Sequence, residues 1–408
     1  MRCRNCNSKN MHSMIDLGSA PASNAYVKVS ELQSSEVYTP LKVLICDNCK
    51  LVQTRDYFKE NDLFTDEYAY LSSASNAWLE HCSKYCKMIT NKLKLDTSSQ
   101  VCEVASNDGY LLTNFLDLGI NCFGIEPTTA AAKIGQKKGI PTIIDFLGES
   151  TAHKIVKDKG KSDLIIGNNV FAHVPDIRDF TKGLKILLKD EGSITLEFPH
   201  VLSLLEHNQF DTIYHEHFSY HSLIGCQNIF DNEDLLIYDV EKLDTHGGSL
   251  RLFVQHKNGP HTISKNLEVL LEKEYSYGLD KVETYLKLEE KALHIRDSLR
   301  KTISDIKLAG GNIVAYGAAA KGNTLLNFCG INHKDIDYVF DRSILKIGKF
   351  MPGSNIPILD ASEITKYNFT HIMILPWNIK NEVLSQLKGQ SITGKVITAI
   401  PEVIIEKI

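Results

Sequence analysis

The sequence predicts an α/β protein in three parts: a small metal-binding module over residues 1–67, a doubly wound, Rossmann-like domain over 68–260, and a second Rossmann-like α/β domain over 261–408. Three observations support this. Two Cys-x-x-Cys pairs lie near the N-terminus, short apolar runs alternate with helical segments from residue 100 onward, and another strand–turn–helix pattern begins near residue 311. A chain of 408 residues also exceeds what one hydrophobic core normally serves.

The first part is predicted to be held together by zinc. The pairs Cys3-x-x-Cys6 and Cys46-x-x-Cys49 each set two sulfurs on one tight turn, which is the spacing of a tetrahedral thiolate site. Four thiolates leave no open position, so the site is structural; the alternative, a redox pair, needs only one such motif. The other cysteines show no metal spacing and are expected to be small buried side chains: Cys82, Cys86, Cys102, Cys122, Cys226 and Cys329.

The second part begins with a helix and continues as alternating strands and helices. Residues 75–94 have helical spacing, and their apolar face is formed by Trp78, Leu79, Cys82, Tyr85, Cys86 and Ile89. Helices are expected over 110–118 and 130–138. The predicted strands are residues 101–104, 122–125, 141–144, 163–166 and 192–197. Repeated βα units of this length predict a parallel sheet with helices on both faces.

The third part follows a long helical connector. Residues 262–308 carry helical periodicity with many Glu/Lys pairs, which predicts one or two helices. Strands are then expected over residues 311–317, 337–341 and 371–375. The two α/β parts are not recognisable repeats of each other.

Composition narrows the class of protein. The chain is 43% hydrophobic and 23% charged, as in soluble globular proteins, and its net charge of -5 argues against an electrostatic grip on nucleic acid or an anionic membrane. No apolar run approaches the length of a membrane span, and the first residues lack the apolar core of a signal peptide. We therefore expect a cytoplasmic enzyme, and three packed parts are compatible with a monomer.

The turn after the first predicted strand indicates the kind of cofactor. Glu103-Val-Ala-Ser-Asn-Asp-Gly109 has a single glycine, so it is a poor cradle for a pyrophosphate, yet it is rich in carboxylate and amide groups. That chemistry suits a cationic cofactor without phosphates, such as S-adenosylmethionine. Glu126, after the second strand, is placed to accept both ribose hydroxyls, and Asp145-Phe146 could bind and stack on an adenine. Each acid alone is explained as well by a turn or helix cap, but three at successive strand ends favour a cofactor site.

The stretch Tyr214-His-Glu-His-Phe concentrates proton-transfer groups. Imidazole titrates near neutrality and is the usual general base at physiological pH. The alternatives are a polar surface loop or a catalytic metal held by His200, His207, His215 and His217. These histidines lack the His-Glu-x-x-His pattern, which disfavours the metal.

Taken together, these features resemble one family along essentially the whole chain: the S-adenosylmethionine-dependent sugar C-methyltransferases that act on nucleotide-linked 4-keto-deoxysugars. The resemblance rests on the paired cysteine motifs and on several specific segments. These are Ser106-Asn-Asp-Gly109, Asn169-Val-Phe-Ala-His173-Val, Tyr214-His-Glu-His-Phe, His246-Gly-Gly-Ser-Leu-Arg251, Tyr316-Gly-Ala-Ala-Ala-Lys-Gly322 and Pro352-Gly-Ser-Asn-Ile-Pro357.

The resemblance implies methylation at carbon 3 of the sugar, in a cleft between the cofactor domain and the C-terminal domain. A ketone at carbon 4 makes the neighbouring C–H acidic, so the reaction needs a base, donors for the enolate oxygen and an aligned methyl group. By similarity, His217 is the base, Tyr214 and Glu216 orient it, and His173 hydrogen-bonds the developing oxyanion. By the same similarity, Tyr68 reaches the substrate; Tyr70, two residues further along, is the alternative for this role. His215 is expected to be structural.

The same resemblance defines the binding residues. The cofactor site comprises Glu103, Ala105, Asn107, Asp108, Gly109, Glu126, Asp145, Phe146, Asn168 and Asn169. The substrate site comprises Tyr68, His173, Tyr214, His246, Arg251, Lys321 and Asp341.

The C-terminal domain is implied to bind the nucleotide part of the substrate. Residues 317–322 open a helix after a strand, so their backbone amides and Lys321 could hold a diphosphate, and Asp341 is expected to contact a ribose. The alternative is a fold that has kept its shape and lost its ligand.

The sequence is less compatible with two other functions. An NAD-dependent oxidoreductase or epimerase would require a standard glycine fingerprint and usually a Tyr-x-x-x-Lys pair, which are missing from the sequence. A zinc-ribbon nucleic-acid binder is disfavoured by the acidic balance.

Overall fold

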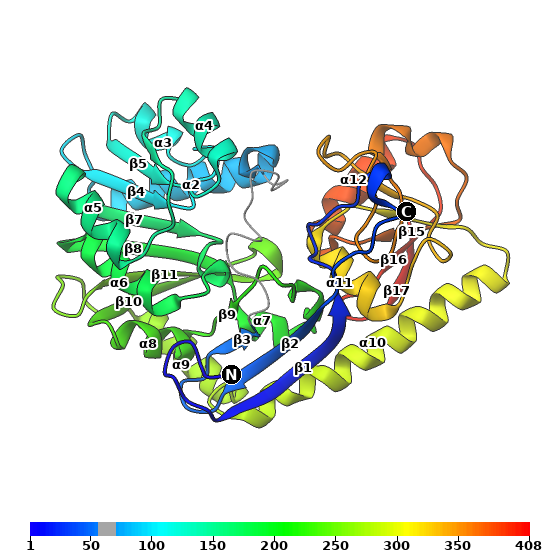
Figure 1. The fold of residues 1–408 in the computed structure, drawn as a ribbon, viewed down its shortest axis with the longest axis horizontal. Coiled ribbons are helices and arrows are strands. Elements are labelled where there is room, and N and C mark those ends of the chain that lie inside the picture. Colours follow the sequence, from blue (N-terminus) through cyan, green and yellow to red (C-terminus); the bar gives the residue numbers. More distant parts are fainter. Residues whose placement is uncertain (56–70) are drawn as a thin grey trace.

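The computed structural model describes residues 1–55 and 71–408 (Figure 1). Three β-sheets organise these residues: a four-stranded sheet near the N-terminus, a seven-stranded central sheet and a six-stranded C-terminal sheet. The two larger sheets contain runs of parallel strands, which confirms the predicted α/β class.

The N-terminal sheet includes a strand from the middle of the chain. Strands β1 (Met11–Ala20), β2 (Thr39–Cys46) and β3 (Val52–Thr54) are antiparallel neighbours. Strand β9 (Ser219–Tyr220) completes the sheet by pairing with β3. Because β9 comes two residues after His217, this pairing fixes one end of the histidine-rich stretch against the zinc module.

The central sheet has the order β10-β11-β8-β7-β4-β5-β6. Its parallel strands are β4 (Gln100–Val104), β5 (Asn121–Ile125), β6 (Thr142–Ile143), β7 (Ser162–Asn168) and β8 (Leu188–Pro199). All five correspond to strands expected from the sequence. Two further strands, β10 (Leu235–Leu243) and β11 (Ser249–His256), were not expected, and β11 runs antiparallel to both β8 and β10.

Both faces of the central sheet are buried, which explains why its strands read as continuous apolar runs. Along β4, Val101 belongs to a core formed with α2 and α3, whereas Cys102 belongs to a core formed with α5, α6 and α8. Helix α2 shows the predicted apolar face, of whose residues Leu79 alone is only partly buried. Its N-terminus is capped by Ser75, whose hydroxyl accepts a hydrogen bond from the Trp78 N–H.

The α-helices among the described residues are α2 (Asn76–Leu93), α3 (Thr113–Asp117), α4 (Thr129–Lys137), α5 (Glu149–Lys159), α6 (Ile177–Leu187), α7 (Val201–Glu206), α8 (Leu223–Asp231), α9 (Lys265–Tyr277), α10 (Val282–Leu308), α11 (Ala320–Cys329) and α12 (Lys380–Gly389). Short 3-10 turns include η3 (Phe171–His173), η4 (Phe210–Thr212), η5 (Thr245–Gly247) and η7 (Trp377–Ile379). None of the described helices combines the length and apolar character needed to cross a bilayer.

The C-terminal sheet has the order β14-β13-β12-β15-β16-β17. Its strands are β12 (Ile313–Tyr316), β13 (Val339–Asp341), β14 (Ile358–Asp360), β15 (His371–Ile374), β16 (Lys395–Thr398) and the antiparallel β17 (Ile404–Lys407). The chain starts in the middle, builds outward to β14 and returns to the other side at β15. This creates a switch point between β12 and β15, where doubly wound sheets bind ligands.

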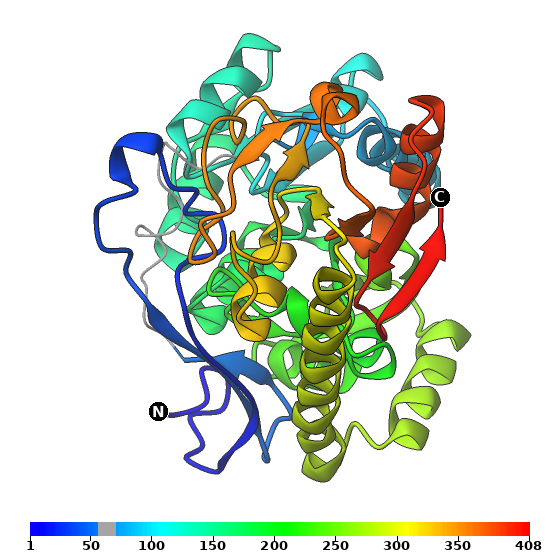
Figure 2. The same ribbon diagram turned by 90° about the vertical axis from the view of Figure 1, so that its right-hand side faces the viewer.

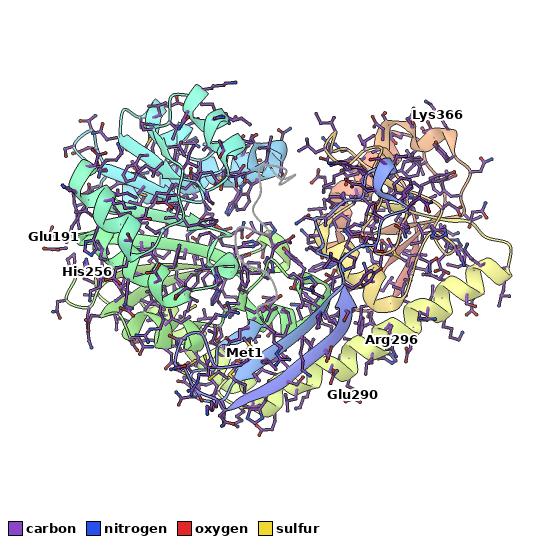
Figure 3. All side chains as sticks on the ribbon, viewed as in Figure 1. Met1, Glu191, His256, Glu290, Arg296 and Lys366 are labelled. Atoms are coloured by element: carbon purple, nitrogen blue, oxygen red, sulfur yellow. The ribbon has the colours of Figure 1, made fainter. Side chains whose placement is uncertain are left out.

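Helix α10 ties the N-terminal sheet to the C-terminal part. It runs beneath β1 and β2 and continues along the C-terminal sheet (Figures 1 and 2). Its inward residues Leu288 and Leu299 share one hydrophobic core with Ile15 of β1 and Ile313 of β12, while Glu290 points outward to solvent (Figure 3). The predicted connector is therefore a shared structural support.

Candidate active site

The four predicted zinc ligands come together. The ligand sulfurs of Cys3, Cys6, Cys46 and Cys49 all lie within 4.8 Å of one another, and no other group of potential metal ligands occurs among the described residues. Each knuckle ends with a residue in the left-handed conformation, Asn7 and Lys50, which turns the chain back toward its first cysteine. This donor set fits a closed tetrahedral zinc site and has a structural role.

The zinc module touches the histidine-rich stretch directly. Arg4, inside the first knuckle, donates hydrogen bonds to the carbonyls of Thr54 and Pro175 at 2.9 and 3.0 Å, and its guanidinium lies 5.5 Å from the ring of Phe218. The module thus reaches the residue next to His217.

His217 is buried and held in one tautomer. Its Nδ1 lies 3.0 Å from the carbonyl oxygen of Thr212. A carbonyl can only accept, so Nδ1 carries the proton and Nε2 retains its lone pair. Burial lowers the pKa of His217 well below its usual value; the proximity of the titratable groups of His173, His246 and Lys321 lowers it further, and the hydrogen bond to the Thr212 carbonyl raises it in part. The ring is therefore neutral at physiological pH and competent to accept a proton.

His173 and Tyr214 frame this ring. The ring centroid of Tyr214 lies 3.9 Å from that of His217, and the centroid of His173 lies 4.7 Å away, edge-on. The Nδ1 of His173 donates to the backbone carbonyl of Glu216 at 2.8 Å, and burial lowers the pKa of His173 to about 4. His173 is thus also neutral, with its proton on Nδ1.

The Glu216 side chain turns away from His217. Its Oε2 accepts a hydrogen bond from the Asn24 side-chain amide at 3.0 Å, and burial raises the pKa of Glu216 to about 7. Among the contacts of the described residues, the group that orients His217 is the Thr212 carbonyl, whereas the sequence had suggested the carboxylate of Glu216. His215 points elsewhere, as expected, and its Nε2 lies 2.9 Å from Thr39 Oγ1.

The acids of the predicted cofactor site lie at the carboxyl ends of β4, β5 and β6. Glu103 is fully buried, which raises its pKa well above the usual value, and the Tyr110 hydroxyl offsets this only in part. Glu126 accepts hydrogen bonds from the backbone N–H groups of Asn107 and Thr128, at 2.9 and 2.8 Å.

The remaining two acids are also engaged. Asp108 pairs with Lys138 at 3.0 Å, and Asp145 accepts from the Phe146 N–H and the Thr151 hydroxyl, both at 2.9 Å. The acids therefore shape the turns around the site as well as facing it.

Several residues at these strand ends have a strained backbone. Ala105 and Asn107 after β4, and Asn169 after β7, have φ between 48° and 55° although none is glycine. His246, before β11, has φ of 55° and accepts a hydrogen bond from the Asn169 side-chain amide at 3.1 Å. Such strain clusters at functional sites because the surrounding structure must hold it.

A buried amide at the end of β7 fits an S-adenosylmethionine site. Asn168 is 7% exposed, and neither atom of its side-chain amide has a hydrogen-bond partner within the part of the chain that the structure describes. Unsatisfied buried amides are rare, so a ligand group is the natural partner. The amide, the nearby acids and the single Gly109, whose φ is 74°, suit a ligand with hydroxyl and amine groups.

Arg251 supports the site through a network of ion pairs. It is 2% exposed and pairs with Glu197 at 2.6 Å and with Glu241 at 2.5 Å, while Glu197 also lies 2.9 Å from His81. This buried ion-pair network uses both ends of the guanidinium. The structure thus places Arg251 in the scaffold under His246 instead of on a surface open to substrate.

Lys321 and Asp341 lie at the switch point of the C-terminal sheet. Lys321 Nζ donates to Asn378 Oδ1 at 2.8 Å; burial lowers its pKa, and Asp211 partly opposes this. The two oxygens of Asp341 accept backbone N–H groups of Ala318 and Ser343, at 2.6 and 2.7 Å. Asp341 therefore shapes the loop that carries Lys321.

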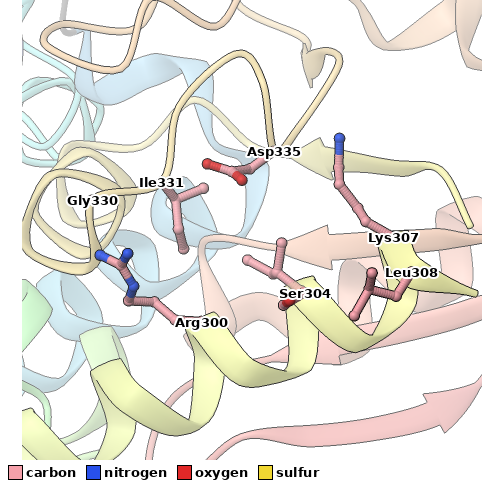
Figure 4. Close-up of a pocket in the computed structure, with 8 residues that line it drawn as sticks. Arg300, Ser304, Lys307, Leu308, Gly330, Ile331 and Asp335 are labelled. Carbon is pink, nitrogen blue, oxygen red and sulfur yellow. The ribbon is translucent and has the colours of Figure 1, made fainter.

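Two parts of the molecule stand apart from this picture. Tyr68 and Tyr70 lie outside the described residues. A pocket of about 390 Å³ lies between the end of α10 and the loop after α11, lined in part by Arg300, Lys307 and Asp335 (Figure 4). It contains none of the predicted site residues.

Sequence reasoning missed the groups that hold the site residues in place. Thr212 acts through its backbone carbonyl, which no side-chain pattern reveals. Asn24 lies between the two cysteine pairs and belongs to no motif. Glu197 and His81, which anchor Arg251, carried no motif of their own, although Glu197 ends a predicted strand.

Comparisons with known proteins agree with this site. Family models match along the chain: a zinc-binding domain over residues 3–64, a methyltransferase domain over 78–237 and a C-methyltransferase C-terminal domain over 244–401. The C-methyltransferase NovU of Streptomyces niveus is 30% identical over 401 residues, covering 98% of this chain and 95% of the relative.

Two solved structures each match less than half of this chain. The PH0226 protein of Pyrococcus horikoshii OT3 is 13% identical over 46% of this chain and 95% of its own, with a TM-score of 0.38. A SAM-dependent methyltransferase of Anabaena variabilis ATCC 29413 is 17% identical over 43% of this chain and 84% of its own, with a TM-score of 0.33.

The family models, the full-length relative and the site geometry lead to the same conclusion. The central sheet is that of a class I methyltransferase, its cofactor is S-adenosylmethionine, and the four cysteines of the N-terminal module form a structural zinc site. The chain belongs to the C-methyltransferase family, whose members join a zinc-binding domain, a methyltransferase domain and a C-methyltransferase C-terminal domain.

Proposed function

We propose that this enzyme transfers a methyl group from S-adenosylmethionine to carbon 3 of a nucleoside-diphosphate 4-keto-6-deoxy sugar. The observation that carries the proposal is the state of His217: buried, neutral, and with its Nδ1 proton committed to the Thr212 carbonyl. A C-methyltransferase must generate a carbon nucleophile, and a C–H next to a ketone yields one when a base is positioned beside it.

Each step can be given to residues of this chain. Nε2 of His217 takes the proton from carbon 3, and the electron pair of the C–H bond passes into the enolate. When bound, S-adenosylmethionine supplies an electrophilic methyl group, to which carbon 3 bonds as the sulfur–methyl bond breaks. His217 is buried, which would limit the access of water to the reacting carbon.

The tautomer of His173 changes its proposed role. Because its Nδ1 donates a hydrogen bond to the Glu216 carbonyl and burial lowers its pKa to about 4, its Nε2 is an acceptor. That suits a sugar hydroxyl, whereas an enolate oxygen needs a donor. The Tyr214 hydroxyl and the Lys321 ammonium can donate; the ring of Tyr214 lies 3.9 Å from that of His217, and Lys321 is near enough to lower the pKa of His217.

Other predicted residues keep binding roles in this proposal. Asn168, Glu126 and the 103–109 turn would hold the cofactor, since they surround the carboxyl ends of β4, β5 and β7. The switch point of the C-terminal sheet would take the nucleotide, with Lys321 near its diphosphate. Membership in the C-methyltransferase family disfavours the alternative of an NAD-dependent oxidoreductase. A sugar-nucleotide substrate is consistent with a cytoplasmic enzyme.

The product identifies the reaction. We expect that, with S-adenosylmethionine labelled at the methyl carbon with carbon-13, the thymidine-diphosphate keto sugar gains a methyl whose carbon couples to a ring carbon in NMR spectra. A methyl bonded to oxygen would contradict the proposal. No product with thymidine, uridine, guanosine or cytidine diphosphate sugars would also contradict it.

A further inference from the structure

Trp377 is the point where three segments of the site meet. It begins η7, directly after β15 of the C-terminal sheet. Its Nε1 donates to Asp211 Oδ2 at 2.7 Å, and its ring lies 4.6 Å from the Nζ of Lys321. A Cβ added to Gly247, next to His246, would lie 2.3 Å from the ring, so the indole also packs closely on η5.

The residues that Trp377 holds are those that orient His217. Asp211, Thr212 and Ile213 are consecutive, and the Thr212 carbonyl is the acceptor for His217 Nδ1. The Ile213 carbonyl accepts a hydrogen bond from the Thr324 hydroxyl of α11 at 2.8 Å. Two hydrogen bonds from the C-terminal part thus fix the chain on either side of the carbonyl that sets the tautomer of the base.

Asp211 depends on this arrangement. Its side chain is 0% exposed, so its charge is stabilised by groups of the protein and not by water. The Trp377 N–H is a directional donor to that carboxylate. The nearby Lys321 and the backbone N–H groups of Asp211 and Thr212 also stabilise the carboxylate, but the Trp377 N–H is the contact that ties it to η7, so its loss leaves the turn that carries Thr212 less firmly held.

We propose that Trp377 is a positioning residue for proton abstraction: through Asp211 it fixes the Thr212 carbonyl, and with it the ring of His217. This inference rests on the proposed function of His217 as the base. Because Lys321 lies over the same indole, Trp377 also connects the predicted diphosphate site with the base.

Kinetics test this role with matched variants. Trp377→Phe removes the N–H together with the outer part of the indole that packs on Gly247, and Asp211→Asn removes the charge of the acceptor while leaving the indole in place. We expect each to lower kcat about tenfold or more while the KM for the keto sugar changes less than about threefold. The kcat of the double variant should be no lower than that of the less active single variant, because both substitutions act on the same hydrogen bond.

Tyr285→Phe is the control. It removes another buried hydrogen bond, to the Leu279 carbonyl at 2.9 Å, away from the site, and kcat should stay within about twofold. Wild-type kcat in Trp377→Phe, or additive losses in the double variant, would overturn the inference.

A measurement without substrate separates this inference from the proposed function. Nitrogen-15 NMR of histidine-labelled protein, with the His217 signals identified by their loss in His217→Asn, reports which ring nitrogen carries the proton. In the wild type we expect the Nδ1–H tautomer alone, and in Trp377→Phe a mixture of tautomers. An unchanged His217 signal in the variant would refute the role of Trp377, whatever the enzyme's substrate proves to be.

Discussion

At the scale of single residues, the site is defined by which nitrogen of each imidazole carries its proton. His217 and His173 both donate Nδ1–H to backbone carbonyls, of Thr212 and Glu216. In both, burial favours the neutral ring. Two neutral rings, each with Nε2 as its acceptor atom, suit the proposed site, which takes a proton from carbon and recognises hydroxyl groups.

His217→Asn removes the basic lone pair while leaving a polar side chain of similar reach. We expect turnover to fall by about 10²–10⁴-fold, the usual contribution of a general base. The affinity for S-adenosylmethionine, measured by calorimetry, should stay within about threefold, because the proposed cofactor residues lie on other segments. A variant that retains full turnover would remove His217 from the mechanism.

The depressed pKa of His173 predicts a pH dependence of stability. Its pKa is about 4 in the folded chain and near 6.5 when unfolded. Between these values the unfolded chain holds the proton and the folded chain does not, so the free energy of unfolding falls as pH falls from 6.5 toward 4. We expect this group to account for about 2 kcal/mol of that loss. Urea titrations of wild type and His173→Gln at pH 7 and pH 4.5 measure it; equal losses in both would contradict the prediction.

Much of this residue-level picture could be predicted from the sequence, and some could not. His217, His173 and the four cysteines were identified because their side chains form motifs. The Thr212 carbonyl and the Asn24 amide were not, because their roles depend on where the fold brings them. Glu216 and Arg251 lay in recognisable motifs, yet their contacts turn out to be with Asn24 and with Glu197.

At the scale of elements, the carboxyl ends of the parallel strands carry the predicted cofactor residues. The alternation of strands and helices predicted this, since parallel strands end on one edge of a sheet. It did not predict β9 or the β10–β11 pair. Strand β9 is two residues long and gives no periodic signal, and β11 pairs with β8 across roughly 50 residues of chain.

Gly247 is a test of the contact between η5 and η7. It has φ of +90°, and an added Cβ would lie 2.3 Å from Trp377. We expect Gly247→Ala to lower the free energy of unfolding by about 1–3 kcal/mol and to reduce kcat as Trp377 is displaced.

Gly18→Ala is the matched control for this substitution. Its φ is +76°, and nothing lies within 4 Å of the added Cβ. It should cost only the backbone strain, about 1 kcal/mol, and leave kcat unchanged. Equal kcat losses in both variants would show that the collision with Trp377 does not matter.

The zinc module should be sensitive to a single thiolate. Cys46→Ser replaces a buried ligand at the end of β2, so we expect loss of zinc and a Tm lower by several degrees. Turnover should also fall, because Asn24 and Arg4 of this module contact the histidine-rich stretch. Metal analysis by mass spectrometry gives the zinc content; one zinc per chain in the variant would refute the four-thiolate site.

At the scale of the whole molecule, the three predicted parts are more connected than their sequence patterns suggest. One hydrophobic core joins β1 and β2, helix α10 and the C-terminal sheet. The sequence predicted the parts from local periodicity, and periodicity does not show which apolar faces meet. The boundaries near residues 67 and 260, and the monomeric state, stay predictions; limited proteolysis and sedimentation would test them.

This connection gives the architecture a functional reason. The histidine-rich stretch lies between β9, which is paired to the zinc module, and η4, which is held by Trp377 and Thr324. His217, the proposed base, is thus positioned by contacts from all three parts, while the cofactor and the nucleotide are expected on different sheets. Methyl transfer between ligands on separate sheets requires such a fixed point.

The central claim is that His217 forms an enolate of the keto sugar. The most direct test is mass spectrometry and NMR of a thymidine-diphosphate 4-keto-6-deoxy sugar incubated in deuterated water, with S-adenosylhomocysteine in place of the methyl donor. We predict that the wild type introduces one deuterium at carbon 3, beyond an enzyme-free control, and that His217→Asn does not. The claim would be contradicted if His217→Asn exchanged deuterium as fast as the wild type and still transferred methyl from S-adenosylmethionine.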